Sequence, residues 1–300
     1  MSEYVVIGAT GNIGSVVVRE LLKQGKAVRA VSRDAARLKD LEEMGAEVWV
    51  GSYEDPDALL GAFAGARAAF TMVRTVRDDT SRYRKVGETL ARAAAQAKLQ
   101  HIVNLSSIGA DLAVDSGHLR DFYELEHAFE PVTRASIIHL RAGFFMDNFL
   151  RSIQEIRASQ RITGMLRADL PMPMIWTGDI GATAASWLQE KPETGVHVRE
   201  LLGQRDVTMA EAANAIGRSI GTPALSYVQS RYDPPLNAEE AHYVETGIEN
   251  DVVKHRIATY RAYNSRAARA HEVRSAANTT PTSIETFAEK ILRPAYEKAV

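Results

Sequence analysis

The chain has 300 residues, of which 45% are hydrophobic and 25% charged, and its formal net charge at pH 7 is −2. These values are ordinary for a globular protein, and so small a net charge gives no indication of a strongly basic nucleic-acid or membrane surface. Without cysteine, the chain has no disulfide, thiolate nucleophile or cysteine metal site. No apolar run is long enough for a membrane span, and the first strand is expected from residue 4. We therefore expect a cytoplasmic protein without a signal peptide.

The N-terminal stretch combines a short apolar strand, residues 4–7, with a run of regularly spaced glycines that leads into an apolar-periodic helix. In such a turn the first glycine permits a tight bend and the second a close approach of backbone to a pyrophosphate. The third lets the helix pack closely on the strand. Because a helix start presents free N–H groups, the stretch predicts a dinucleotide site. The residues expected to bind the cofactor there are Gly8, Thr10, Gly11, Asn12, Ile13 and Gly14.

Strands and helices alternate from residue 4 to about residue 142 with short connections, which predicts an α/β fold with a doubly wound parallel sheet. Asp34 is the expected N-cap after the second strand, and Asp55, followed by Pro56, the N-cap after the third. Long helices are expected over 80–97 and 118–129. The strands after the first are expected at 28–31, 48–50, 68–72, 102–105 and 137–140.

Beyond residue 143 this alternation ends, so we expect a Rossmann domain over 1–150 and a smaller, mostly helical substrate lobe over 151–300. Within the second part, 163–177 is expected to be turn-rich and 195–202 to return a strand to the sheet. Residues 235–275 have a helical character, acidic first and basic later, which favours a solvated face or a dimer surface over nucleic-acid binding. Helix starts are predicted at the capping boxes Thr208–Glu211 and Thr282–Glu285, and another helix over 179–189.

The end of the second strand indicates which dinucleotide is bound. An acidic residue at this position would bind the adenosine ribose and favour NAD. The chain instead has Ser32 and Arg33, and a guanidinium can hold a 2′-phosphate with two N–H groups. NADP(H) is therefore preferred, with NAD(H) left open. Further cofactor contacts are expected where later strands end: Ser52 near the adenine, Met72 and Val73 along the pyrophosphate, and Ser106 and Ser107 near the nicotinamide.

Four motifs, GATGNIG at 8–14, NLSSIGA at 104–110, RAGFFMDNF at 141–149 and DIG at 179–181, stand in a characteristic order and spacing. Together they resemble the NmrA-like family of atypical short-chain dehydrogenase/reductases, over residues 4 to about 229 and more weakly over 281–291. The resemblance implies a Rossmann core, NADP(H) or NAD(H) in the glycine loop and a C-terminal lobe over the nicotinamide. The family includes quinone and dye reductases, and also regulators that bind the cofactor without turnover.

The pair Tyr-x-x-x-Lys of ordinary short-chain dehydrogenases is missing, since no tyrosine has a lysine four residues later. The resemblance implies a His-x-x-x-Lys version, in which His118 matches the first position and Phe122 replaces the lysine. His118 is the candidate catalytic residue, as a proton donor or a group that orients the acceptor. The alternative is a purely structural histidine. Tyr123 and His127 form a second pair, displaced from the expected position.

Phe144, Phe145 and Asn148 are the candidate acceptor-binding residues. A quinone requires little from a protein, because hydride adds to an already electrophilic ring and the cofactor supplies the chemistry. Two functions remain open: an NADPH-dependent reductase of a small conjugated acceptor such as a quinone, or a catalytically silent NADP(H)-binding regulator that acts through a partner protein. The expected ligands are the dinucleotide and a small acceptor. A homodimer stays open, and neither metal, nucleic acid nor membrane is expected.

Overall fold

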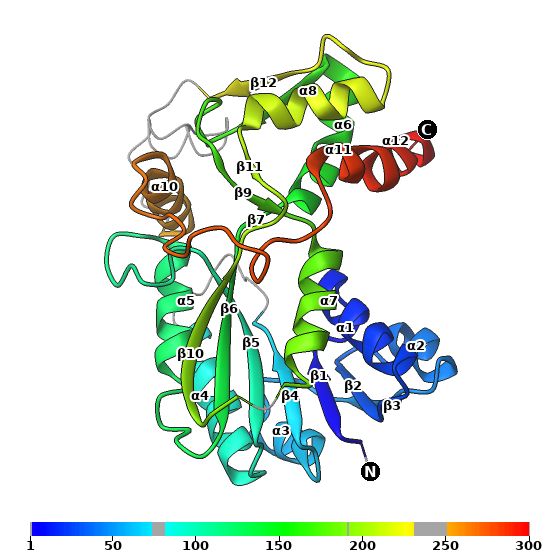
Figure 1. The fold of residues 1–300 in the computed structure, drawn as a ribbon, viewed down its shortest axis with the longest axis vertical. Coiled ribbons are helices and arrows are strands. Elements are labelled where there is room, and N and C mark those ends of the chain that lie inside the picture. Colours follow the sequence, from blue (N-terminus) through cyan, green and yellow to red (C-terminus); the bar gives the residue numbers. More distant parts are fainter. Residues whose placement is uncertain (1, 74–81, 191, 231–250, 300) are drawn as a thin grey trace. The chain divides into compact units, whose positions relative to one another are not determined.

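The computed structural model describes residues 2–73, 82–190, 192–230 and 251–299, with only the backbone described at 251–253 (Figure 1). The chain forms two compact units. Unit 1 comprises Met1–Ala110, Asp121–Arg141 and Thr177–Arg199, and unit 2 comprises Asp111–Arg120, Ala142–Trp176 and Glu200–Val300. The sequence predicts one division near residue 150, whereas these units alternate along the chain because a later helix and strand belong to unit 1.

Unit 1 is built on a seven-stranded sheet in the order β10-β6-β5-β4-β1-β2-β3. Pairing is parallel between β1 and β2, β1 and β4, β2 and β3, and β4 and β5. The strand order reverses beside β1, as in doubly wound folds. The predicted doubly wound parallel sheet is confirmed. The strands are β1 (Tyr4–Ile7), β2 (Val28–Ser32), β3 (Glu47–Val50), β4 (Ala68–Thr71), β5 (His101–Ser107), β6 (Ser136–Ala142) and β10 (Gly195–Leu201).

The helices beside this sheet begin and end where the sequence provides caps. Asp55 accepts hydrogen bonds from the backbone N–H groups of Asp57 and Ala58, and Pro56 opens the helix, as predicted. A buried cluster joins α3, α4 and α5 to the sheet through side chains such as Phe63 and Leu90. The helical segments are α1 (Asn12–Lys23), η1 (Ala36–Leu38), α2 (Lys39–Glu43), α3 (Pro56–Phe63), α4 (Arg82–Gln96), α5 (His118–His127) and α7 (Thr177–Trp187).

The DIG motif at 179–181 lies on α7, which packs against α1 (Figure 1). A Cβ added to Gly181 would lie 2.6 Å from the Cβ of Val16 and 2.9 Å from the carbonyl oxygen of Ile13. Only glycine allows the two helices to approach so closely. The motif therefore holds the helix that follows the glycine loop, although it lies some 170 residues further along the chain.

Unit 2 has a second core and two small sheets, one in the order β11-β9-β7 and one pairing β12 with β8. The stretch 163–177, expected to be turns, contains the whole of β9 and the end of β8, which are too short to show a period. The strands are β7 (Phe144–Phe145), β8 (Arg161–Gly164), β9 (Met172–Ile175), β11 (Asp206–Val207) and β12 (Ser226–Gln229). The helical segments are η2 (Met146–Ser152), α6 (Ile153–Ser159), α8 (Met209–Ser219), α10 (Asp251–Asn264), α11 (Ile284–Phe287), η3 (Ala288–Leu292) and α12 (Arg293–Lys298).

Two helix predictions in unit 2 need correction. The helical character expected to residue 275 ends at Asn264, and the segment after it contains no helix until Ile284; residues 231–250 lie outside the described chain. The capping box of Thr208 and Glu211 is confirmed. Near the C-terminus the cap is Ser283, whose side chain accepts the N–H of Thr286, and not its neighbour Thr282. A cap accepts from the residue three positions on, so the helix start decides which hydroxyl serves.

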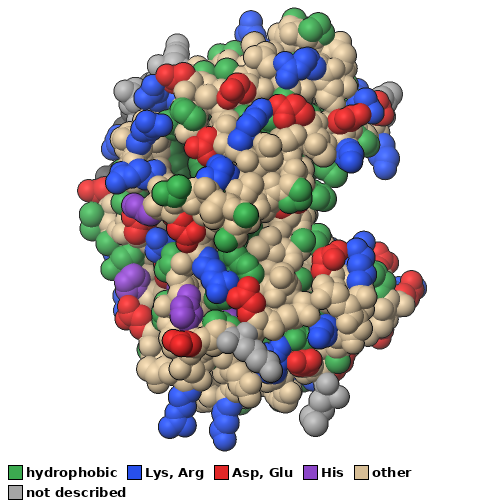
Figure 2. All heavy atoms as spheres, in the orientation of Figure 1, with side chains coloured by type: hydrophobic (Ala, Val, Ile, Leu, Met, Phe, Trp, Pro, Cys, Tyr) green, Lys and Arg blue, Asp and Glu red, His purple; other side chains and the backbone are tan. Residues whose placement is uncertain are grey.

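The surface carries mixed charge. Figure 2 shows lysine and arginine side chains interspersed with aspartate and glutamate on the visible face. This distribution agrees with the small net charge of the sequence. In the described part of the chain, no helix is both long and apolar enough to span a bilayer.

Candidate functional site

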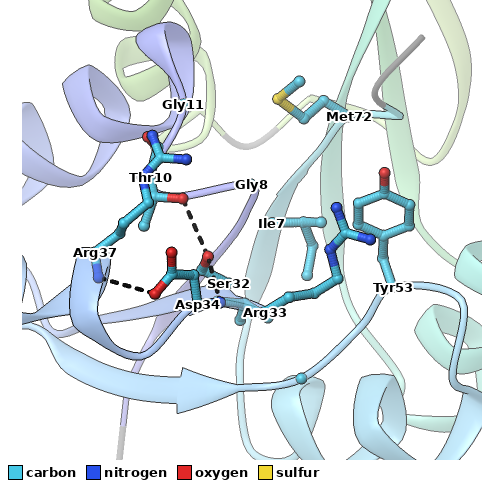
Figure 3. A pocket seen from close by; sticks show the side chains of 12 residues that line it. Ile7, Gly8, Thr10, Gly11, Ser32, Arg33, Asp34, Arg37, Tyr53 and Met72 are labelled. Atoms are coloured by element: carbon cyan, nitrogen blue, oxygen red, sulfur yellow. Dashed lines mark hydrogen bonds between the residues drawn. The ribbon is translucent and has the colours of Figure 1, made fainter. Parts of the chain in front are cut away.

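A cavity of about 570 Å³ opens in unit 1 where β1, β2 and β4 end (Figure 3). Ligands of open α/β sheets bind at this edge, beside the strand where the order reverses. Its position therefore matches the dinucleotide crevice of a doubly wound fold. The residues that line it are Ile7, Gly8, Thr10, Gly11, Val31, Ser32, Arg33, Asp34, Arg37, Gly51, Tyr53 and Met72.

The glycine loop forms one wall, and its geometry requires glycine at two positions. Gly8 has φ +72°, in the left-handed region, and its carbonyl accepts the N–H of Gly11 at 3.0 Å. A Cβ on Gly14 would lie 2.3 Å from the carbonyl oxygen of Gly8. The start of α1 therefore lies directly against the end of β1, and Gly11, its N-cap, has no side chain to cap it. Such a helix start is suited to a phosphate group.

Two arginines also line the cavity, Arg37 beside the glycine loop and Arg33 on the side of Tyr53 (Figure 3). Arg37 donates an Nη2 hydrogen bond to the carbonyl oxygen of Thr10 at 2.7 Å, which ties the segment after β2 to the glycine loop. The hydroxyls of Thr10 and Ser32 are 3.1 Å apart. Arg33 has no hydrogen-bond partner among the described residues, and Figure 3 shows its guanidinium beside the ring of Tyr53. Two exposed cations at one cavity match the charge of a phosphate.

The carboxylate beside these arginines is used locally. Asp34 Oδ1 accepts the backbone N–H of Ala36 at 3.0 Å and that of Arg37 at 3.4 Å. The helical turn η1 begins at Ala36 with Ala35 as its N-cap, so the cap predicted at Asp34 lies one residue later. Arg37 itself was not predicted from the sequence. The available signal was its spacing, four residues after Arg33, which is about one helical turn.

At the end of β3, Ser52 was the predicted cofactor contact, but its two neighbours line the cavity instead. Ser52 Oγ accepts the N–H of Glu54 at 3.1 Å in a local turn, while Gly51 and Tyr53 face the cavity. The hydroxyl of Tyr53 is buried without a hydrogen-bond partner among the described residues. Sequence reasoning passed over this tyrosine because a small polar residue stood before it.

The other predicted cofactor residues take different places. Met72 lines the cavity, whereas Val73 is buried in the core of unit 1. In the glycine loop, Asn12 is exposed and the side chain of Ile13 is buried. Ser107 is half-buried, and its hydroxyl donates to the carbonyl of Ile108.

Ser106 belongs to a buried ion pair below the sheet edge. Its hydroxyl donates to Glu126 Oε1 at 2.5 Å, and Arg141 donates from Nε to the same oxygen at 2.9 Å and from Nη2 to Oε2 at 2.7 Å. Glu126 is only 6% exposed. A buried carboxylate needs such partners, so the Ser106 side chain serves to join β5 to α5.

A second group of buried polar side chains is hydrogen-bonded across three strands, β4, β5 and β6. Thr71 donates to Asn104 Oδ1 at 3.0 Å, and Asn104 Nδ2 lies 3.1 Å from His139 Nδ1. Burial lowers the pKa of His139 to about 4, because the charged imidazolium would lose its hydration. His139 is therefore neutral at physiological pH and accepts the Asn104 hydrogen bond.

His118, the catalytic candidate, lies in unit 2 at the start of α5. Its backbone N–H donates to Thr259 Oγ1 at 2.8 Å, and its ring is half-buried. Phe122, in the position of the family's lysine, packs in unit 1 with its ring 5.4 Å from that of Tyr83. A side chain directed into the core cannot hold a ribose hydroxyl. The pair of Tyr123 and His127 is stacked on the same helix, with ring centroids 3.8 Å apart.

The acceptor candidates lie in unit 2 at the start of its first strand. Phe144 pairs with Met174 across β7 and β9, and its ring is 5.8 Å from that of Phe149. Phe144, Phe145 and Asn148 are all half-buried. No group of three or more metal-ligating side chains occurs within the described residues.

A doubly wound parallel sheet with a glycine turn at the reversal of strand order defines a Rossmann-type dinucleotide-binding protein. The model of the NmrA-like family matches residues 2–287. The chain therefore belongs to the NmrA-like family, and the family predicted from the four motifs is confirmed.

Similar proteins include several reductases. The NAD(P)H azoreductase of Xenophilus azovorans is 29% identical over 245 residues, which cover 81% of this chain and 80% of that protein. The triphenylmethane reductase of Citrobacter sp., solved with NADP(H), has a TM-score of 0.72 at 20% identity and covers 99% of this chain and 100% of its own. An NADPH-dependent quinone oxidoreductase of Escherichia coli has a TM-score of 0.76 at 20% identity, and the alignment covers 95% of this chain and 98% of that one. NmrA, a negative transcriptional regulator, has a TM-score of 0.74 at 17% identity, and the alignment covers 100% of this chain and 98% of that one. These solved structures share the fold.

Proposed function

We propose that this chain is an NADPH-dependent reductase that transfers hydride to a small, flat, conjugated acceptor such as a quinone. The observation that carries the proposal is the cavity of unit 1, which is lined by a glycine turn and two exposed arginines. Support also comes from the azoreductase relative, which is aligned over most of both chains and uses NAD(P)H by name.

The residues of the cavity fit an NADP(H) molecule in three respects. The close packing at Gly14 holds the start of α1 against the end of β1, and Gly11 at that helix start has no side chain between the backbone and a pyrophosphate. Arg33 and Arg37 supply N–H donors for a 2′-phosphate, and the ring of Tyr53, which lines the cavity, offers a flat contact for the adenine. When bound, the reduced nicotinamide supplies the hydride.

The remaining chemistry asks little of the protein. In this proposal Phe144 and Phe145 contact the flat acceptor, Asn148 orients it, and His118 donates a proton to the reduced oxygen. A quinone yields a stable phenolate, so its reduction does not need the lysine-activated phenol that ordinary short-chain dehydrogenases use for ketones. Phe122 in the lysine position is compatible with this acceptor class.

The test is the loss of NADPH absorbance on mixing with a panel of quinones, azo dyes and simple ketones. We expect turnover with conjugated acceptors and none with ketones. His118→Gln should lower the turnover number, while His127→Gln, which changes an exposed histidine on the same helix, is the matched control. Absence of NADPH oxidation with every conjugated acceptor would rule the proposal out.

A second candidate is a cofactor-binding regulator without turnover. The packing of Phe122 on Tyr83 favours it, because the lysine position is filled by a half-buried aromatic residue that packs against the core of unit 1. A regulator, NmrA, also shares this fold. This alternative predicts NADPH binding in calorimetry, no oxidation with any acceptor, and a pull-down of a partner protein that changes with NADPH.

A further inference from the structure

Helix α5 follows a glycine, and a hydroxyl from a distant part of unit 2 accepts its first backbone N–H group. The residue before its first position is Gly117, which has no side chain to accept an N–H group. The N–H of His118 donates instead to Thr259 Oγ1 on α10, 141 residues later in the chain, at 2.8 Å. A side-chain oxygen that accepts such an N–H performs the work of an N-cap.

The backbones of the two helices are in close contact at this point. Gly117 has φ +57°, and a Cβ there would lie 1.9 Å from the carbonyl oxygen of His255 and 2.4 Å from Thr259 Oγ1. Thr259 donates its own hydroxyl proton to the carbonyl of His255 at 2.9 Å. That bond orients the hydroxyl so that a lone pair remains for the N–H of His118.

The same helix also contacts the ring of His118. The His255 ring lies edge-on to it, with centroids 5.6 Å apart and planes at 61°. Below them, an apolar cluster formed by Leu119, Ala262 and Ala268 fixes α5 against α10. Backbone, ring and apolar contacts therefore all connect the start of α5 to α10.

We propose that α10 positions His118 for proton transfer. Thr259 is the positioning residue that caps α5, and the imidazole edge of His255 limits rotation of the His118 ring. This inference rests on the proposed function, in which His118 donates the proton. If the cap is lost, the first turn of α5 loosens and the ring occupies productive geometry for less of the time. Misplacement of a reacting group lowers the rate of the chemical step more than the binding of cofactor.

The test compares Thr259→Val, which removes the hydroxyl at similar volume, with Thr259→Ser, which retains it. Thr89→Val is the matched control, because Thr89 is a half-buried residue of α4 that makes the same bond to a carbonyl four residues earlier. We expect Thr259→Val to lower kcat about tenfold with little change in KM for NADPH. Thr259→Ser and Thr89→Val should keep the kcat of the unaltered protein.

Each change is then repeated together with His118→Gln. If Thr259 acts through His118, Thr259→Val should have no further effect on kcat in that background, because the group it positions is gone. The imidazole NMR signals of His118 should also shift in Thr259→Val and not in Thr89→Val. A melting temperature equal to that of the unaltered protein shows that Thr259→Val folds, so that a lower kcat is not caused by unfolding.

The outcomes separate this inference from the function on which it rests. Loss of kcat in His118→Gln with an unchanged kcat in Thr259→Val overturns the positioning role and leaves the reductase intact. An equal loss from Thr259→Val in both backgrounds also overturns it, since the threonine would then act independently of His118. Full activity of His118→Gln refutes the proton-donor role itself.

Discussion

Arg33→Ala should change cofactor preference more than any other single substitution at the cavity. In unit 1 its guanidinium lines the cavity and has no hydrogen-bond partner among the described residues, so its full set of donors is available to a 2′-phosphate. A hydrogen bond to a charged group contributes about 1.5–3 kcal/mol, and the exposure of this side chain places it at the lower end. A loss of about 1.5 kcal/mol is about tenfold in Kd for NADPH, with Kd for NADH unchanged.

Arg37→Ala should behave differently, because that guanidinium already donates to the carbonyl of Thr10. Its removal takes away part of the phosphate contact and also releases the glycine loop, which binds the pyrophosphate common to both dinucleotides. We therefore expect weaker binding of NADPH and of NADH together, about threefold to tenfold each. The ratio of the two dissociation constants should change less than in Arg33→Ala.

Isothermal calorimetry with both dinucleotides measures these ratios directly. Arg33→Lys keeps the charge without the planar fork and should retain part of the preference. Arg92→Ala, which removes an exposed arginine from α4, controls for the change in net charge. If Arg33→Ala binds NADPH and NADH in the ratio of the unaltered protein, the assignment of the 2′-phosphate site is refuted.

Three further results are expected. Gly14→Ala should weaken binding of both dinucleotides at least tenfold in calorimetry, since its Cβ would lie 2.3 Å from the Gly8 carbonyl oxygen; unchanged affinity would contradict that close packing. Because the pKa of His139 falls from 6.5 to about 4 in the folded state, only the unfolded chain takes up its proton between those pH values. Stability should therefore fall by about 3 kcal/mol from pH 7 to pH 4 in urea unfolding, and His139→Leu should remove most of this slope. Phe122→Lys should lower Tm by breaking the contact with Tyr83 and should not create ketone reduction.

The local features of the site follow from residue types and their spacing. A tight turn at Gly8 and a close helix at Gly14 require glycine, so the loop could be located in the sequence before its surroundings were known. The parallel sheet followed from the alternation of strands and helices, and caps such as Asp55 and Thr208 act within three residues of their helix starts. Each of these depends on neighbours close along the chain.

The partners of several side chains were decided only by the tertiary structure. Arg37 and Tyr53 reach the cavity because β2 and β3 end at the same edge of the sheet as the glycine loop. Ser106 turns to Glu126, and His118 receives its cap from Thr259, 141 residues away. No periodicity records such contacts, because each depends on where folding brings two distant segments together.

The short strands β8 and β9 could not be predicted from the sequence for a similar reason. Each has four residues, too few for a period to be recognised, and each is a strand only because another segment pairs with it. The sequence by itself determined the glycine loop, the alternation of strands and helices and the basic residue after β2, since these depend on residue types and on spacing that is local in the chain. Which side chains share the cavity, and which helix holds His118, depends on packing between segments far apart in the chain, and only the folded structure decides it.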